Sequence, residues 1–273
     1  MSSIQSHTID AGGILTHYLE AGEGAPLILL HGGGAGADSR SNWRVTIPLL
    51  APHFRVIAMD MVGFGDTAKP DPQYFTYSQS ARIDHLRHFM RALGIARAVL
   101  VGNSMGGCTA LGLAVLDPAM VERLVLMGSA GLTTEIHKDL LPVVNYDFTR
   151  DGMVRLIRAL VNDRFTIDDE LVTYRHQRSL EPEARRAYSA TVQWIRDAGG
   201  LFYESGFIAR ARCPTLVVNG KQDKVVPLAN AYRFLELIPK SWGYVIPDCG
   251  HWAMMEHPRD FAQATLAFAQ RAN

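Results

Sequence analysis

The sequence predicts an α/β fold, in which a mostly parallel, doubly wound sheet carries an inserted helical lid. Short apolar runs rich in β-branched residues recur along the chain, and each ends in glycine or a polar loop. Helical patterns separate several of these runs, and from about residue 132 to 205 the runs stop and helices take over. Strands that alternate with helices form βαβ units with right-handed crossovers, which place the strands parallel in one sheet.

The length favours one large domain with an insertion. The chain has 273 residues, of which 48% are hydrophobic and 20% charged. An α/β fold can reach about 250 residues as one unit, and this composition is that of an ordinary globular protein. We therefore expect a first core segment at 1–131, the helical lid at 132–205 and a second core segment at 206–273.

Six apolar runs predict the strands of the core, at 26–33, 55–63, 98–104, 123–129, 215–221 and 244–250. Their near-continuous apolarity is typical of strands covered on both faces. The segment 7–22 instead predicts a hairpin at the sheet edge, turning at residues 11–13. Helices are expected at 80–94 and 106–118 in the core.

The lid is predicted from three helical signals. Residues 153–161 carry one apolar stripe at helical spacing. Thr166 supplies a hydroxyl three residues before Asp169, as at a helix start. A third helix is expected to begin near Pro182 and to stop at Gly199.

The charge balance excludes several classes of partner. Lysine plus arginine number 27 and aspartate plus glutamate number 27, so the formal net charge is +0. Such a chain has no general attraction to nucleic acid or to anionic membranes. No apolar run approaches the roughly 20 residues that span a bilayer, and the start lacks the order of a secretory signal. The expected partner is a small-molecule substrate, and the expected location is the cytoplasm.

The three cysteines predict neither disulfides nor a metal site. Cys108, Cys213 and Cys249 lack CxxC spacing, and the neighbours of the first two are apolar. Buried, reduced thiols are therefore expected, and zinc is not. No metal and no cofactor is predicted.

The strongest motif is the run Gly102-Asn103-Ser104-Met105-Gly106. It follows an apolar run and precedes a helical pattern, which is the strand, tight turn and helix that a G-x-S-x-G nucleophile elbow requires. Glycines relieve the turn, and the helix N-terminus favours negative charge at the serine. Ser104 is the predicted nucleophile, against the alternative of a structural turn serine.

A serine nucleophile needs a base oriented by an acid, here in the chain order serine, acid, histidine. His251 has a glycine-flanked position past the last apolar run, and Asp223 lies in the loop after the run TLVV. Asp60 is the main rival acid, but it precedes the serine. His31 is expected to brace the glycine loop that follows it. Most of the remaining histidines are expected in solvent, including His7, His17, His53, His85, His88 and His137.

The predicted oxyanion hole combines two backbone N–H groups. The run His31-Gly32-Gly33-Gly34 follows the first core strand, where an HGGG-type loop supplies one donor, assigned to Gly33. The residue after the nucleophile, Met105, supplies the other. The loop lacks the lysine of a phosphate-binding loop and an acidic ribose partner, so a nucleotide site is not expected.

With these motifs in place, the whole chain resembles the α/β-hydrolase superfamily and, within it, the meta-cleavage product hydrolases. The resemblance lies in the segments HGGGAGADSRSNW, VIAMDMVGFGDTAKP, VGNSMGG, LVLMGSAGL, GKQDKVVP and CGHWAMMEHP. It is nearest to the hydrolases of biphenyl-, dibenzofuran- and carbazole-type ring-fission products. It implies a cofactor-free enzyme that cleaves the C5–C6 bond of a 2-hydroxy-6-oxo-hexa-2,4-dienoate with an aryl or alkyl group at C6.

The resemblance also implies residues that grip the carboxylate and 2-oxo end of such a substrate. Arg175 matches the family's lid arginine, and Asn42, Asn103 and Trp252 match other substrate-contacting positions. Gly32 and Gly34 of the glycine loop are expected beside them. Plain alternatives stay open: a solvated arginine, a helix cap at Asn42, an elbow-stabilising Asn103 and a core Trp252.

Competing readings share much of this machinery. A carboxylesterase or perhydrolase would use the same triad and loop without needing Arg175, and a non-catalytic receptor could share the fold. The pocket wall around C6 is expected from five lid residues: Leu140, Val144, Phe148, Met153 and Ile157. A homodimer or higher homo-oligomer is expected from the resemblance alone.

Overall fold

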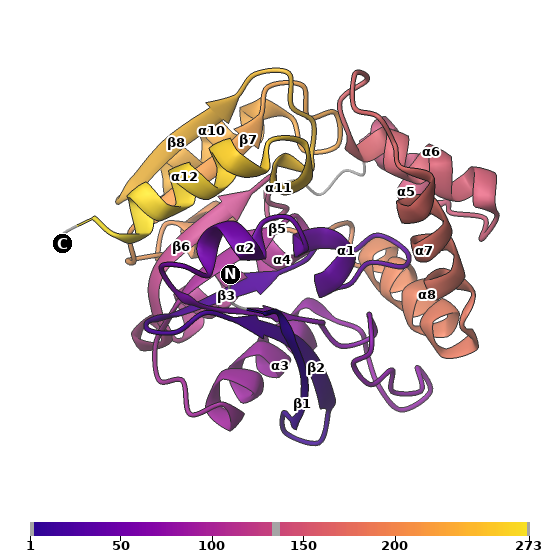
Figure 1. Ribbon diagram of the computed structural model, residues 1–273, viewed down its shortest axis with the longest axis horizontal. Coiled ribbons are helices and arrows are strands. Elements are labelled where there is room, and N and C mark those ends of the chain that lie inside the picture. The colour runs from indigo at the N-terminus through magenta and orange to yellow at the C-terminus, as the bar shows by residue number, and fades with distance from the viewer. Residues whose placement is uncertain (1–2, 133–136, 272–273) are drawn as a thin grey trace.

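Among residues 3–132 and 137–271, which this computed structural model describes, eight strands form one sheet (Figure 1). The strand order is β1-β2-β4-β3-β5-β6-β7-β8. The strands are β1 (Gln5–Asp10), β2 (Leu15–Ala21), β3 (Pro26–Leu30), β4 (Arg55–Met59), β5 (Ala98–Asn103), β6 (Val121–Met127), β7 (Thr215–Gly220) and β8 (Ser241–Ile246). Every run predicted as a strand overlaps one, although β6 and β8 begin before their predicted runs.

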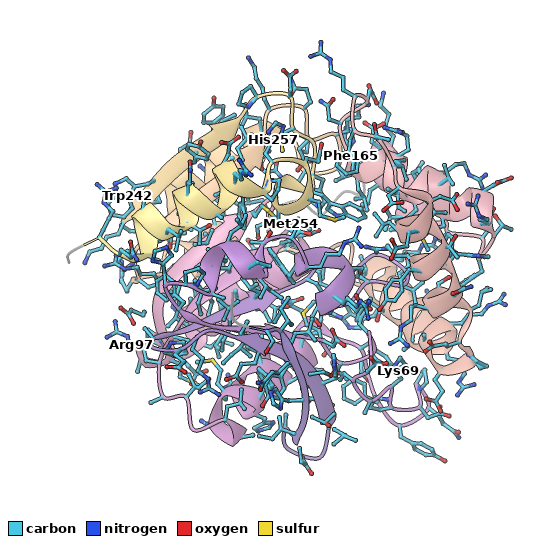
Figure 2. All side chains as sticks on the ribbon, viewed as in Figure 1. Lys69, Arg97, Phe165, Trp242, Met254 and His257 are labelled. Atoms are coloured by element: carbon cyan, nitrogen blue, oxygen red, sulfur yellow. The ribbon has the colours of Figure 1, made fainter. Side chains whose placement is uncertain are left out.

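The hairpin and the parallel core are confirmed. β1 pairs with β2 antiparallel at one edge, β2 joins β4 antiparallel, and all other neighbours are parallel. β8 begins three residues earlier than predicted, because this edge strand exposes Trp242, Tyr244 and Val245 and so lacks a continuous apolar pattern. Figure 2 shows Trp242 at the outer edge of the molecule, whereas Met254 lies in its interior.

Helices cover both faces of the sheet. α4 (Met105–Leu116) is apolar all round and packs on β5 and β6 beneath α3 (Gln79–Ala92). The remaining core helices are α1 (Ser39–Trp43), α2 (Ile47–Leu50), η1 (Pro118–Met120), α9 (Ser205–Ile208), α10 (Leu228–Leu237), α11 (Ala253–Glu256) and α12 (Pro258–Ala269). Within the described part of the chain, no helix is long and apolar enough to cross a membrane.

Between β6 and β7 the chain forms a separate group of helices, seen at the right of Figure 1. They are η2 (Lys138–Leu140), α5 (Leu141–Val144), α6 (Arg150–Leu160), α7 (Asp169–Leu180) and α8 (Pro182–Asp197). The first residues of the predicted lid, 133–136, lie outside the described residues. The predicted start of the middle helix at Thr166 is wrong. Asp168 is extended and caps α7 with its carboxylate, which accepts from the N–H of Glu170, so the helix begins later.

Candidate active site

A pocket lies at the carboxyl ends of the central strands, beneath the lid helices. Parallel α/β sheets bind ligands at this edge, because the loops that follow the strands converge there. The wall includes the glycine loop after β3, the elbow after β5, Ala130 after β6, and both loops of the second core segment. The pocket therefore collects the loops on which the sequence places the reactive groups.

Ser104 occupies a strained turn between β5 and α4. Its backbone has φ 54° and ψ −115°, a conformation that residues other than glycine rarely adopt. A Cβ added at Gly102 would lie 2.5 Å from the carbonyl carbon of Gly106, and one at Gly106 would lie 2.4 Å from the carbonyl oxygen of Leu30. Only glycines fit at these two positions, so the elbow presses tightly against β3 and holds the hydroxyl over the sheet.

His251 and Asp223 form a buried pair in the pocket that Ser104 also lines. The His251 Nδ1 lies 2.8 Å from the Asp223 Oδ2, and the other carboxylate oxygen accepts from the N–H groups of Val225 and Val226 at 3.0 and 2.9 Å. Because Asp223 accepts from Nδ1, the imidazole Nε2 is left as the basic nitrogen. Ser104 and His251 line the same pocket without a direct hydrogen bond, as catalytic groups often do before a substrate binds.

Gly128, which follows β6, leaves room for this pair. Its φ is +49°, and a Cβ there would approach the His251 Nδ1 to 2.8 Å and the Asp223 Oδ2 to 3.0 Å. The backbone of this loop runs past the pair with no side chain between. Asp223, which follows β7, can therefore reach His251 in the pocket that Ser104 lines after β5.

Asp60, the rival candidate for the acid, makes its hydrogen bonds outside the His251 pair. Asp60 accepts from the His17 Nδ1 at 2.7 Å and from the N–H groups of Ser39 and Asp66 at 2.6 and 2.9 Å. Its two oxygens are thus committed to the loops that follow β3 and β4. The partner it meets is His17, while His251 faces Asp223.

Two histidine expectations are corrected. His85 is buried, not solvated: its side chain contacts the Thr16 hydroxyl at 2.7 Å and accepts from the N–H of Val62 at 3.1 Å. Burial lowers its pKa to about 3, so this imidazole is neutral at pH 7. His17 is mostly covered because the Asp60 carboxylate holds it, and that hydrogen bond raises its pKa. Both histidines support the edge hairpin, a contact that local polarity does not reveal.

The glycine loop lies directly over the elbow, where the oxyanion hole was expected. His31 braces it as expected: Nδ1 donates to the Gly32 carbonyl at 2.8 Å, and Nε2 accepts from the N–H of Met61 at 3.0 Å. A Cβ on Gly33 would come within 2.9 Å of the Met105 Sδ, so the two predicted donors belong to adjoining backbone segments. Met105 is also the first residue of α4, where N–H groups are free of helical partners.

Arg175 is buried in the pocket wall, not solvated, with 1% of its surface exposed. Its guanidinium donates to the Ala35 carbonyl at 3.0 Å and to the Asn42 Oδ1 at 3.5 Å, and lies 4.9 Å from the ring centre of Trp252. Its Nε has no hydrogen-bond partner, and no carboxylate of the described residues lies within salt-bridge distance. Burial lowers its pKa to about 10, which leaves it charged at pH 7.

The two predicted asparagines lie in the same wall. Asn42 is buried within α1, whose cap is Asp38, so the helix-cap alternative is wrong. The Asn103 amide donates to the Met127 carbonyl at 3.1 Å and supports the elbow, while its Oδ1 is buried without a partner. That oxygen lies 2.8 Å from where a Cβ of Gly32 would stand. Gly34 faces the Arg175 Nη2 in the same way, at 3.0 Å.

The expected C6 wall is right in part. Leu140 and Val144 line the pocket, but Phe148, Met153 and Ile157 do not. Met153 and Ile157 are fully buried, so most of the α6 stripe packs inside the lid, and Leu160 at the end of the helix lines the cavity. Sequence reasoning missed the other lining residues, which are Ala37, Ala130, His137, Val143, Leu160, Tyr188, Val192, Ile195, Gly200, Leu201, Val225, Val226 and Asn230. The apolar pair Val225-Val226, which begins two residues after Asp223, was a signal that could have indicated this part of the wall.

The pocket has two chemically different sides. The glycine loop, Asn42 and Arg175 stand on the β3 side of Ser104, whereas Ala130 and Val226 follow β6 and β7 on the other side. One side thus offers a buried cation and amides, and the other is mainly apolar. A ligand that spans the serine would place an anionic end at Arg175 and an apolar end near Val226.

Comparison with known proteins agrees with this geometry. The sequence model of the alpha/beta hydrolase fold family matches residues 25–258. The 2-hydroxy-6-oxo-6-(2′-aminophenyl)hexa-2,4-dienoic acid hydrolase of Metapseudomonas resinovorans is 59% identical, covering 96% of this chain and 90% of the relative. The 2-hydroxymuconate semialdehyde hydrolase of Pseudomonas sp. strain CF600 is 37% identical, over 97% and 94%.

Two solved structures superpose closely. A serine hydrolase involved in carbazole degradation has a TM-score of 0.91 at 56% identity, covering 98% of this chain and 99% of its own. A meta-cleavage product hydrolase from Pseudomonas fluorescens IP01 has the same TM-score at 36% identity, covering 98% of both chains. The chain belongs to the α/β hydrolase fold family and, within it, to the meta-cleavage product hydrolases, which cleave carbon–carbon bonds.

Proposed function

We propose that this enzyme hydrolyses the C5–C6 bond of a 2-hydroxy-6-oxo-6-arylhexa-2,4-dienoate to 2-hydroxypenta-2,4-dienoate and an aryl carboxylic acid. The observation that carries the proposal is Arg175, a buried cation without a carboxylate partner, standing across Ser104 from an apolar wall. A buried charge of this kind is costly unless a ligand pairs with it. The substrate has an anion at one end and an apolar ring at the other, which matches both sides.

The proposed roles follow from where charge develops. Arg175 and Asn42 hold the carboxylate and 2-oxo end, which stabilises the keto form that accepts electrons when C5 departs. His251, oriented by Asp223, moves the proton to C5 and activates Ser104 for attack at the C6 carbonyl. The N–H groups of Gly33 and Met105 stabilise the oxyanion. The proton that C5 gains comes from the 2-hydroxyl group; water supplies the hydroxyl of the acid product, and its remaining hydrogen restores the 2-hydroxyl group of the dienoate.

The first test is bleaching of the yellow dienolate. Purified enzyme is expected to bleach the 6-phenyl substrate quickly, with dienoate and benzoate formed in equal amounts. The 6-methyl analogue and a p-nitrophenyl ester run beside it under the same conditions. Rapid ester hydrolysis with neither dienolate bleached would overturn the proposal in favour of a carboxylesterase.

Asn230 supports an aryl ring that carries an amino group. This residue lies in the first turn of α10, four residues after Val226, and lines the otherwise mainly apolar side. Among the described residues its side chain has no hydrogen-bond partner; only its backbone N–H donates, to the Pro227 carbonyl at 2.8 Å. A 2′-amino group on the ring would be a hydrogen-bond partner for the Asn230 amide. The substrate in the name of the 59% identical relative carries a 2′-aminophenyl group.

Replacement of Asn230 by leucine, which keeps the volume and removes the polarity, is therefore expected to be selective. One lost hydrogen bond of about 1 kcal/mol should lower kcat/KM for the 2′-aminophenyl substrate about fivefold, with little change for the phenyl substrate. Steady-state kinetics on both substrates measure this. Val226→Ala is the matched control, since a lost apolar contact should weaken both. An equal effect of Asn230→Leu on both substrates would exclude the contact.

The homodimer and the cytoplasmic location expected from the sequence stay predictions. Light scattering on the purified protein measures the first directly.

A further inference from the structure

A carboxylate outside the predicted triad holds the turn that carries His251. The Glu256 Oε2 accepts from the N–H of Gly250 at 2.9 Å, and its Oε1 accepts from the N–H of Trp252 at 3.0 Å. These two amides flank His251 on either side in the chain. The carboxylate thereby fixes the backbone from which the imidazole projects.

The same carboxylate reaches the lid. The Glu256 Oε2 also accepts from the N–H of Asn162 at 2.7 Å, directly after the end of α6. Three amides from two segments far apart in sequence therefore converge on one side chain. A carboxylate suits this position because both its oxygens only accept.

The lid and the His251 turn are also in direct contact. The N–H of His251 donates to the Leu160 carbonyl at 2.8 Å. A Cβ on Gly250 would lie 2.6 Å from the Asn162 nitrogen, so no side chain fits between the two backbones. Burial raises the pKa of Glu256, while its backbone hydrogen bonds act against that shift. The segment of residues 160–162 and the turn of residues 250–252 are therefore packed backbone against backbone, and the Glu256 carboxylate is hydrogen-bonded to both; we call this contact the joint.

We infer that Glu256 is a positioning residue for the reaction: it fixes His251 and Trp252 against the lid, and so sets where the basic nitrogen stands relative to Ser104. The inference rests on the proposed role of His251 as the base. Without the carboxylate, three amides lose their acceptor and the turn relaxes. A displacement of about 1 Å at a catalytic group can cost about 100-fold in rate.

Glu256→Gln and Glu256→Ala test the inference. The amide keeps one acceptor oxygen and turns a donor toward the other amides, so we expect kcat to fall about tenfold, and about 100-fold for alanine, which keeps none. The loss should appear on both the dienolate and the p-nitrophenyl ester, since both need His251. KM should change less than about threefold. Binding is measured separately in the Ser104→Ala background: the Kd of the dienolate should differ by less than about threefold between Ser104→Ala and the double variant that also carries Glu256→Gln.

Asp260→Asn is the matched control. Asp260 is an exposed carboxylate in the first turn of α12, pairs with His257 at 3.5 Å and is not hydrogen-bonded to the turn. The kcat of the Asp260→Asn variant should equal that of the parent enzyme. Activities are expressed per folded molecule, from circular dichroism well below each Tm, so that a variant that folds poorly is not counted as one that reacts slowly. Should alanine prevent folding, the glutamine variant decides alone.

Two results would overturn the inference: kcat within about twofold of the parent for Glu256→Gln, or a loss confined to KM. Failure of the proposed function looks different. An enzyme that hydrolyses only the ester refutes carbon–carbon cleavage, yet its ester kcat still reports whether Glu256 positions the base.

Discussion

Replacement of Ser104 by alanine is expected to lower turnover of the dienolate about 10³- to 10⁶-fold, the range in which loss of a serine nucleophile falls. Alanine keeps the Cβ and fits the strained backbone as serine does, so the elbow should persist. The His251–Asp223 pair and Arg175 are untouched, and binding of the substrate should survive. Stopped-flow turnover and equilibrium titration of the coloured dienolate measure the two effects separately.

Ser129→Ala is the matched control for this variant. Ser129 is a buried serine beside the same elbow, and its hydroxyl donates to the carbonyl of Ala130 at 2.7 Å. Removing that hydroxyl tests whether any small change near the elbow disables the enzyme. Turnover by Ser104→Ala within about tenfold of the parent would refute the nucleophile assignment.

Replacement of Arg175 by methionine is expected to have opposite effects on activity and on stability. The side chain is buried, has no carboxylate within salt-bridge distance, and is aimed at the pocket. Loss of a buried charge that pairs with the substrate costs about 3 kcal/mol, so kcat/KM for the dienolate should fall about 100-fold. Ester hydrolysis should stay near that of the parent, because an ester such as p-nitrophenyl acetate carries no carboxylate.

The stability should rise in the same variant. An apolar side chain of similar volume removes the desolvation cost of the guanidinium, which can stabilise a protein by about 1–4 kcal/mol. The loss of its bond to the Ala35 carbonyl offsets part of that gain. Thermal unfolding measures the sum, and a higher Tm is expected.

Arg178→Met supplies the comparison within the lid. Arg178 lies one turn further along α7 and is paired outside the pocket with Asp66 and Glu181. Its loss should leave dienolate kinetics unchanged. Equal damage to ester and dienolate turnover by Arg175→Met would show that the arginine supports the fold of the site and not the substrate carboxylate.

The fold was predictable because its strands carry local signals. β3, β5 and β7 are mainly apolar runs; β5 ends at Asn103 and β7 at Gly220, while His31 and the glycine loop follow β3. The glycines of the elbow are needed for steric reasons, and the G-x-S-x-G pentapeptide shows them directly in the sequence. β8 was placed late because an edge strand needs no buried pattern on its outer side.

The walls of the site were less predictable, because they depend on which way helices face. The stripe of α6 is a correct helical signal, but most of it packs inside the lid, and Leu160 of α6 shares the cavity wall with Val192 of α8. Periodicity identifies the buried face of a helix without naming what covers it. The joint at Glu256 was missed for the same reason, since its acceptors and donors meet only after the lid folds over the turn.

β6 pairs with β7, although residues 128–214 lie between the two strands in the chain. This order of the elements decides which parts of the active site exist first during translation. A chain leaves the ribosome from its N-terminus, so β3, β5 and the elbow are made while β7, the acid and the histidine are still untranslated. The lid helices are likewise made before the turn at residues 250–252, which the segment after α6 contacts. Nascent chains that have not reached β8 therefore carry Ser104 in an incomplete sheet without His251, its proposed base. A product of translation interrupted before residue 251 lacks that imidazole and is expected to be inactive as a hydrolase.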